Sequence, residues 1–176
     1  MGAFLTDVQT LREQARTNLE QGPVTTAYGA DLDRVLAVLN DALATELVCI
    51  LRYKQHHYAA TGLAAEPVAA EFLAHAAEEQ AHADQIAARI TQLGGTPDFE
   101  PDTLTGRARS QYRTSQDLLE MVSEDLVAER VAIQFYSEVV AWLADGDPTT
   151  RRMLETILAN EEEHAEEMLT FLQKMS

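Results

Sequence analysis

The sequence predicts an all-α protein built around a bundle of four long helices. Apolar residues recur three and four positions apart along most of the chain, which is the spacing of one helix face. Breaks at Gly22-Pro23, Thr61-Gly62, Gly94-Gly95 and Asp145-Gly146 divide the periodic stretches from one another. No β-branched run with two-residue alternation lies between turn signals, so strands are not expected.

The first half of the chain predicts a short helix followed by two long ones. The short helix is expected over about residues 5–20, within an N-terminal helical extension of about residues 1–28. Asp31 is a suitable cap for the first long helix, which should run to about residue 60. The second long helix is expected from about Pro67 to Gly94.

The second half predicts a long loop and two further helices. The loop, residues 96–115, exceeds the usual connection within a bundle, as expected if it crosses the bundle between two parallel helices. The third helix should begin near Ser115. Asp147-Pro148 indicates the start of the fourth, with Asp as cap and Pro at the first helical position. We expect a single domain over residues 1–176, with the bundle at about residues 30–174.

Composition and charge limit the classes of partner. The 13 basic and 29 acidic residues give a net charge of −16, which repels nucleic acid and anionic membranes and attracts cations. A single cysteine, Cys49, excludes an intrachain disulfide and a thiolate cluster built by one chain. The N-terminus lacks the apolar core of a secretory signal, and no stretch approaches the roughly 18 apolar residues of a membrane span. A cytoplasmic location is therefore expected.

Each long helix carries one glutamate among the apolar residues of its predicted core face. The third such face reads Leu119, Val122, Leu126, Glu129, Ile133, Tyr136, Val140 and Leu143. An unpaired carboxylate in a core costs several kcal/mol, and no lysine or arginine occupies a matching position between these glutamates. One glutamate near the midpoint of each helix therefore predicts a shared metal cation. The four are Glu46, Glu79, Glu129 and Glu161.

The spacing of two histidines indicates the kind of metal site. Glu79 and His82, and likewise Glu161 and His164, form Glu-x-x-His motifs, which place a carboxylate and an imidazole on one helix face. With the two single glutamates they predict two hard cations bridged by two carboxylates. This ligand set admits iron and manganese almost equally. The predicted ligands and catalytic residues are Glu46, Glu79, His82, Glu129, Glu161 and His164.

These motifs resemble the ferritin-like di-iron carboxylate superfamily, and within it most closely bacterioferritin. Further similarity lies in LNDALATELV, which leads into Glu46, and in EEQAHADQIAARI around His82. The resemblance covers about residues 32–174 and implies a ferritin-like bundle with two iron ions per chain. It implies oxidation of Fe(II) by oxygen or hydrogen peroxide, followed by iron storage in a hollow shell. Glu79 and Glu161 would then bridge the ions, and Glu46 and Glu129 would be terminal ligands.

Three differences from bacterioferritin bear on haem and assembly. Gln80 occupies the position of the methionine that binds haem between bacterioferritin subunits, so haem is not expected there. The chain ends about a dozen residues after His164, which leaves no room for the short fifth helix that helps close a 24-subunit shell, and it has the extra N-terminal helix instead. Three assemblies remain as alternatives: a dimer, a Dps-like twelve-subunit cage and a 24-subunit cage. Dps proteins place their metals between subunits, whereas this sequence places them within one bundle.

Two other classes of function stay open beside a ferroxidase that stores iron. One is a di-metal oxidase, oxygenase or manganese catalase without storage. The other is a bundle held together by structural metal, or a DNA-coating protein, which the net charge of −16 disfavours.

Several other side chains near the motifs have open roles. We interpret His75 as a hydrogen-bonded core histidine; the alternatives are a residue that supports the metal ligands and a metal-entry ligand. Tyr53 and Tyr136 each follow a single glutamate by seven residues. They either pack in the core with a satisfied hydroxyl, or hydrogen-bond a ligand or pass electrons. Glu78, Glu162 and Glu163 are expected on the helix surface, with a role in guiding iron as the alternative. His56 and His57 are expected to be structural or surface residues, Cys49 an inert small hydrophobe, and Trp142 an interface or core anchor.

Overall fold

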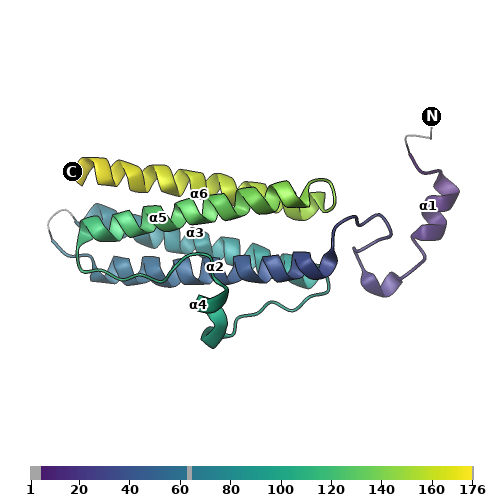
Figure 1. The fold of residues 1–176 in the computed structure, drawn as a ribbon, viewed down its shortest axis with the longest axis horizontal. Helices are drawn as coiled ribbons and strands as arrows, with labels where there is room; N and C mark the ends of the chain where they lie inside the picture. The colour runs from purple at the N-terminus through teal and green to yellow at the C-terminus, as the bar shows by residue number, and fades with distance from the viewer. Residues whose placement is uncertain (1–4, 63–64, 176) are drawn as a thin grey trace.

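The structure, a computed structural model, describes residues 5–62 and 65–175, and in that part of the chain it contains helices and loops without strands (Figure 1). Residues 1–4 of the expected N-terminal extension lie outside the described residues. The four long helices are α2 (Leu32–Ala59), α3 (Ala65–Gln92), α5 (Leu118–Leu143) and α6 (Pro148–Met175). The short elements are α1 (Val8–Gln14), η1 (Leu19–Gln21), η2 (Pro101–Thr103) and α4 (Leu104–Arg107).

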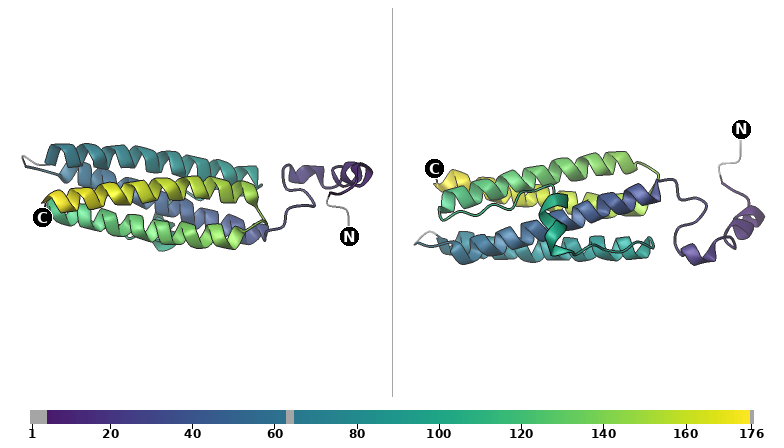
Figure 2. Two further views of the ribbon diagram at one scale, coloured as in Figure 1. Left: turned by 90° about the horizontal axis from the view of Figure 1, so that it is seen from above. Right: turned by 60° about the horizontal axis from the view of Figure 1, so that its bottom comes forward.

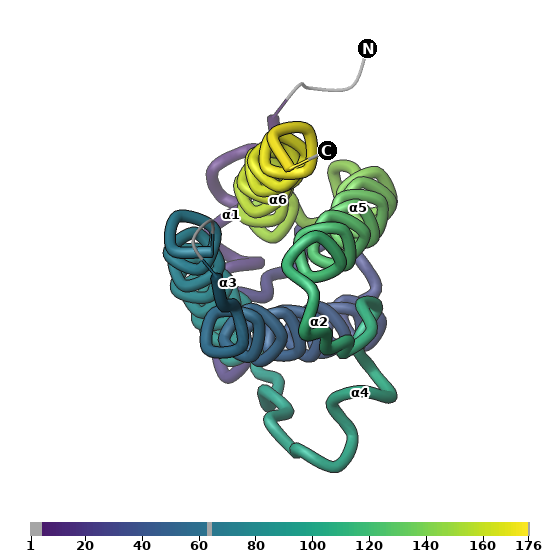
Figure 3. The backbone as a smooth tube through the Cα atoms, turned by 90° about the vertical axis from the view of Figure 1, so that its left-hand side faces the viewer, coloured from purple at the N-terminus to yellow at the C-terminus, as the bar shows by residue number. Residues whose placement is uncertain are grey.

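The long helices form two antiparallel hairpins, α2 with α3 and α5 with α6 (Figure 1). The connection from α3 to α5, which contains η2 and α4, runs back along the outside of α2 (Figure 3). As a result α3 and α5 point the same way, and the chain enters α5 at the end of the bundle from which α3 began (Figure 1). The predicted bundle with one long crossover is confirmed.

Aspartate side chains cap three of the long helices. Asp31 accepts a hydrogen bond from the Arg34 backbone N–H at the start of α2, and Asp117 accepts one from Glu120 at the start of α5. Asp147 accepts from the Thr150 backbone N–H, and Pro148 follows it as the first residue of α6. Each carboxylate satisfies a backbone donor that has no partner within its helix. The third long helix thus begins at its Asp117 cap rather than near Ser115.

The N-terminal extension is less helical than the sequence predicts. The expected helix over residues 5–20 is replaced by the seven-residue α1 and the three-residue η1, which project from one end of the bundle (Figure 2). Val8 and Leu11 are 61% and 50% exposed, so the apolar face of α1 has no partner among the residues that the structure describes. A helix of this length is marginal without packing, which accounts for its early end. Farther along, the extension packs on the bundle through Val24 and Tyr28, and the Tyr28 hydroxyl donates to Asp147 at 3.0 Å.

Two apolar clusters fill the bundle on either side of its middle. The larger contains Leu39, Leu43, Ile86 and Ile157, and the smaller contains Phe72, Met121 and Met168. The predicted face of the third long helix is partly wrong, because Leu119 is 42% exposed whereas Asp125 is fully buried. No helix in the described part of the chain is both long and apolar enough to cross a membrane.

A buried ion pair that the sequence analysis did not anticipate joins the two hairpins. Arg52 on α2 donates from Nε to Asp125 Oδ1 on α5 at 2.7 Å, and His56 Nδ1 lies 2.8 Å from Asp125 Oδ2. All three side chains are at most 1% exposed. Asp125 therefore compensates the guanidinium, and removing it would leave Arg52 charged and unpaired in the core.

Replacing Asp125 by alanine should lower the free energy of unfolding by about 3–5 kcal/mol, because it leaves a buried charge without a partner. Glu124→Ala is the control: its carboxylate lies 3.9 Å from Arg113 at the surface, and its loss should cost less than about 1 kcal/mol. Chemical denaturation of both variants measures the difference. Similar, small losses for both would show that the buried pair does not stabilise the fold.

Candidate metal centre

Six side chains from the four long helices meet between the two apolar clusters, and none of the six residues is more than 4% exposed. They form two overlapping groups, each with its ligand atoms within 4.8 Å of one another. One group is Glu46, Glu79, His82 and Glu161, and the other is Glu79, Glu129, Glu161 and His164. The structure thus brings together all six residues selected from the sequence, and Glu79 and Glu161 belong to both groups.

The distances follow from the helical spacing of the motifs. Glu79 and His82 are one turn apart on α3, and His82 Nδ1 lies 3.2 Å from Glu79 Oε2. The same nitrogen is 3.2 Å from Glu161 Oε1 and 3.4 Å from Glu46 Oε2. His164 Nδ1 lies opposite, 3.6 Å from Glu79 Oε1 and 3.9 Å from Glu129 Oε2.

Several buried polar atoms at the centre lack a hydrogen-bond partner. They are Glu46 Oε2, Glu79 Oε1, Glu129 Oε2, Glu161 Oε1 and His164 Nδ1. A buried oxygen or nitrogen without a partner costs free energy, and carboxylate oxygens and imidazole nitrogens are ligands for first-row metals. One unsatisfied oxygen from each glutamate therefore fits a pair of cations held between the four helices.

Two tyrosines hold the single glutamates from across the bundle. The Tyr53 hydroxyl on α2 donates to Glu129 Oε1 on α5, and the Tyr136 hydroxyl on α5 donates to Glu46 Oε1 on α2. In each carboxylate one oxygen is thus fixed by a tyrosine and the other is free to bind a metal. Core packing and hydrogen bonding to a candidate ligand are both observed for these tyrosines, because each ring is buried in an apolar cluster while its hydroxyl bonds a glutamate.

Glu78 is a functional candidate that the sequence analysis placed on the surface. Its side chain is 53% exposed, yet its Oε2 lies 2.7 Å from His164 Nε2. This contact turns the other ring nitrogen, Nδ1, toward the buried carboxylates. A carboxylate behind a histidine commonly fixes the orientation of a metal-binding ring. Its position directly before Glu79 gave no signal, because the contact depends on how α3 and α6 pack.

The comparisons with known proteins agree with this arrangement. Residues 36–176 match the model of a ferritin-like domain. The chain belongs to the ferritin family. It is 31% identical to a bacterioferritin of Desulfovibrio desulfuricans over 132 residues, which cover 74% of this chain and 70% of the relative.

Solved structures extend the family comparison to the fold. One is the dodecameric thioferritin of Bacteroides fragilis, a bacterioferritin-related protein, with a TM-score of 0.80, 32% identity, and coverage of 84% of this chain and 89% of that one. Another is Rhodobacter capsulatus bacterioferritin, with a TM-score of 0.72, 28% identity, and coverage of 82% and 86%. The resemblance to bacterioferritin within the ferritin family is therefore confirmed.

Burial and the interactions among its charged groups shift the pKa values of the glutamates and histidines in this ferritin-like centre. Burial, and then the charge of Glu79, raise the pKa of Glu46, Glu129 and Glu161. Burial would also raise the pKa of Glu79, but the neighbouring His164 and His82 rings outweigh burial and lower that pKa. Burial lowers the pKa of His82, yet Glu46 and Glu79 overcome this and raise it to about 10. Burial also lowers the pKa of His164, but Glu79 and Glu129 outweigh burial and raise that pKa to about 9.

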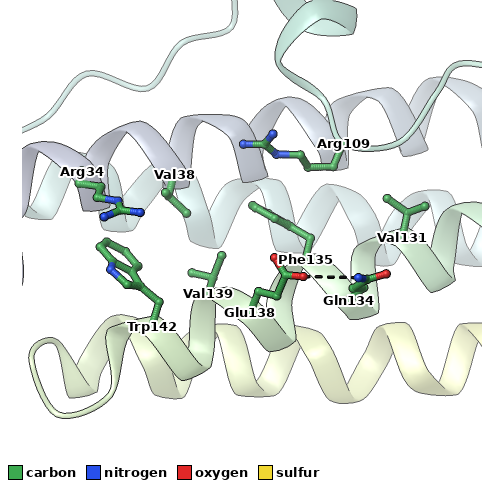
Figure 4. A pocket seen from close by; sticks show the side chains of 9 residues that line it. All are labelled: Arg34, Val38, Arg109, Val131, Gln134, Phe135, Glu138, Val139 and Trp142. Atoms are coloured by element: carbon green, nitrogen blue, oxygen red, sulfur yellow. Dashed lines mark hydrogen bonds between the residues drawn. The ribbon is translucent and has the colours of Figure 1, made fainter.

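The other residues considered in the sequence lie outside the two groups. His56 is buried against Asp125, and His57 Nδ1 lies 2.6 Å from the Ala69 carbonyl oxygen. Cys49 is buried, and its burial raises the pKa of the thiol. Trp142 lines a separate groove of about 570 Å3 between α2 and α5, where the Arg34 guanidinium lies 4.9 Å from its ring centroid (Figure 4).

Without metal, the free energy of unfolding should fall as pH rises from about 6.5 to about 10. The folded-state pKa values of His82 and His164, about 10 and about 9, lie above the ordinary 6.5, so the folded state holds protons that the unfolded state releases. Their contribution is fully present below pH 6.5 and is lost as pH passes through the folded values. Denaturation of the metal-free protein below, within and above this window measures the slope.

A His57→Gln variant is the control for this slope, because that ring contacts a backbone carbonyl outside the centre. It should keep the pH dependence of the parent protein. A stability that stays level or increases over the same range would contradict the proton placement at His82 and His164.

Proposed function

We propose that this chain is a ferroxidase that binds two iron ions within its bundle and oxidises Fe(II) with oxygen or hydrogen peroxide. The observation that carries the proposal is the pair of overlapping ligand groups, in which each buried glutamate has one oxygen without a partner. Four carboxylates also balance the charge of two divalent cations. Membership of the ferritin family supports iron as the metal.

The ligand roles follow from the sharing of residues between the groups. Glu79 and Glu161, which belong to both, are the proposed bridging ligands. Glu46 with His82 would complete one site, and Glu129 with His164 would complete the other. Paired iron bound there would supply the electrons that reduce the oxidant.

The surrounding residues would position the ligands and admit the substrate. Tyr53 and Tyr136 hold the terminal carboxylates, and Glu78 orients the His164 ring. A cavity of about 320 Å3 reaches His82 and His164 from the surface between α3 and α6. This cavity is the proposed route by which Fe(II) and the oxidant reach the buried centre.

Storage would require assembly into a cage, which we propose as a homo-oligomer of single ferritin-like domains. The thioferritin of Bacteroides fragilis is dodecameric at 32% identity. The exposed apolar residues of the N-terminal extension, among them Leu5, Val8 and Leu11, suit contact with another subunit. The proposal includes no haem, because Gln80 offers no haem ligand and its amide donates to Asp84 at 3.0 Å.

Titrating metal-free protein with Fe(II) under oxygen or peroxide should give fast oxidation that continues well past two irons per chain, with the iron still in solution. Ferric absorbance against added equivalents measures this. A Glu79→Gln/Glu161→Gln variant should oxidise Fe(II) no faster than buffer, because both bridging ligands are lost. Glu162→Gln, an exposed neighbour on α6, is the matched control and should behave as the parent.

The endpoint of this titration separates the functions. Oxidation that stops at two irons per chain would exclude storage and favour a di-metal oxidase or oxygenase. A parent protein no faster than buffer would exclude the ferroxidase, and manganese would then be the metal to examine.

Replacing Glu78 by glutamine should weaken metal binding about 10- to 100-fold, the usual effect of losing a carboxylate that orients a metal-binding histidine. Competition with a chelator of known affinity measures the change. Glu163→Gln removes the same charge from the lining of the same cavity without touching His164, so it is the control. Equal weakening in both variants would mean that Glu78 acts only through its charge.

A further inference from the structure

A buried histidine outside the six-residue centre faces two carboxylates near the surface. His75 on α3 is 1% exposed, and its Nε2 lies 2.7 Å from Glu167 Oε2 on α6 and 3.6 Å from Glu71 Oε1, one turn earlier on α3. The side chains of Glu71 and Glu167 are 33% and 42% exposed. Ligand atoms from the three residues lie within 4.8 Å of one another.

The second ring nitrogen determines which atom of His75 is free to bind. Nδ1 lies 3.1 Å from the Tyr53 hydroxyl, and that hydroxyl donates its hydrogen to Glu129. The hydroxyl oxygen can then only accept from His75, so Nδ1 carries the ring hydrogen. In the neutral imidazole, Nε2 therefore presents a lone pair toward Glu71 and Glu167.

When the ring is neutral, this arrangement places three electron-pair donors around one point, because ionised carboxylates accept hydrogen bonds and donate none. The 2.7 Å between Nε2 and Glu167 then has to be bridged by a proton on Nε2 or by a cation. A divalent cation would satisfy the nitrogen and one oxygen of each glutamate together, and this mixture of imidazole and carboxylate suits first-row metals. The bond from Nδ1–H to Tyr53 corresponds to the outer support that metal-binding histidines usually have.

The location connects this cluster to the dinuclear centre. Glu71 and Glu167 line the same cavity of about 320 Å3 that reaches His82 and His164. The His75 ring stacks on the His164 ring with centroids 4.0 Å apart and planes inclined by 19°. Glu163 and Glu166 add negative charge beside the opening, which raises the local concentration of cations.

We propose that Glu71, His75 and Glu167 form a third metal site, which binds a divalent cation at the mouth of the cavity. Fe(II) from solution would bind there first and pass beside the stacked imidazoles to the buried ligands. The identity of the ion and its destination rest on the proposed function, whereas the existence of the site does not.

Loading the metal-free protein with Zn(II), which undergoes no redox change, tests the site directly. Crystals of the loaded protein, measured at the zinc absorption edge, should show three ions per chain, one of them beside His75 Nε2. Metal analysis in solution should give the same number. The Glu71→Gln/Glu167→Gln variant should lose the ion at His75 and keep two, since its substitutions lie on partly exposed side chains.

The charge-matched control is Glu66→Gln/Glu162→Gln, which changes two exposed glutamates on the same two helices and should keep three ions. Two ions in the parent protein, with none at His75, would overturn the third site and leave the ferroxidase proposal intact. A third ion that persists in the Glu71→Gln/Glu167→Gln variant would also overturn it. An ion at His75 with none between Glu79 and Glu161 would support the third site and contradict the proposed dinuclear centre.

Discussion

Four carboxylates buried in one bundle are the constraint on which the rest of this structure depends. Within residues 5–62 and 65–175, no ion pair joins Glu46, Glu79, Glu129 or Glu161 to a lysine or arginine. Their partners are the two histidines and two tyrosines of the same layer. Apolar clusters pack against this layer on both sides, and such surroundings strengthen both the repulsion among the carboxylates and their attraction to a cation.

The parts predicted from the sequence were those encoded by local spacing. Helix period, caps and breaks define the four long helices, and the spacing of Glu-x-x-His places each pair on one face. Buried charge among apolar residues then identified all six side chains that the structure brings together. Such charges are conspicuous in a sequence because a carboxylate on an apolar helix face costs free energy unless it has a partner.

The parts that were missed depend on contacts between distant segments. His75 and Glu167 are 92 residues apart, and nothing in either helix alone indicates that they meet. Asp125 was missed because the true inner face of α5 is rotated from the predicted one, which exposes Leu119. The N-terminal helix is shorter than its pattern predicts because an amphipathic segment gains little stability where it packs on none of the described residues.

The two hydrogen bonds from the tyrosines to the single glutamates have a mechanical consequence. Tyr53 to Glu129 and Tyr136 to Glu46 both join α2 to α5, which belong to different hairpins. Ions bridged by Glu79 and Glu161 would join α3 to α6 in the same layer. If the proposed function holds, bound iron would therefore also hold the two helical hairpins together. A subunit without iron would then unfold, and be degraded, sooner than a loaded one.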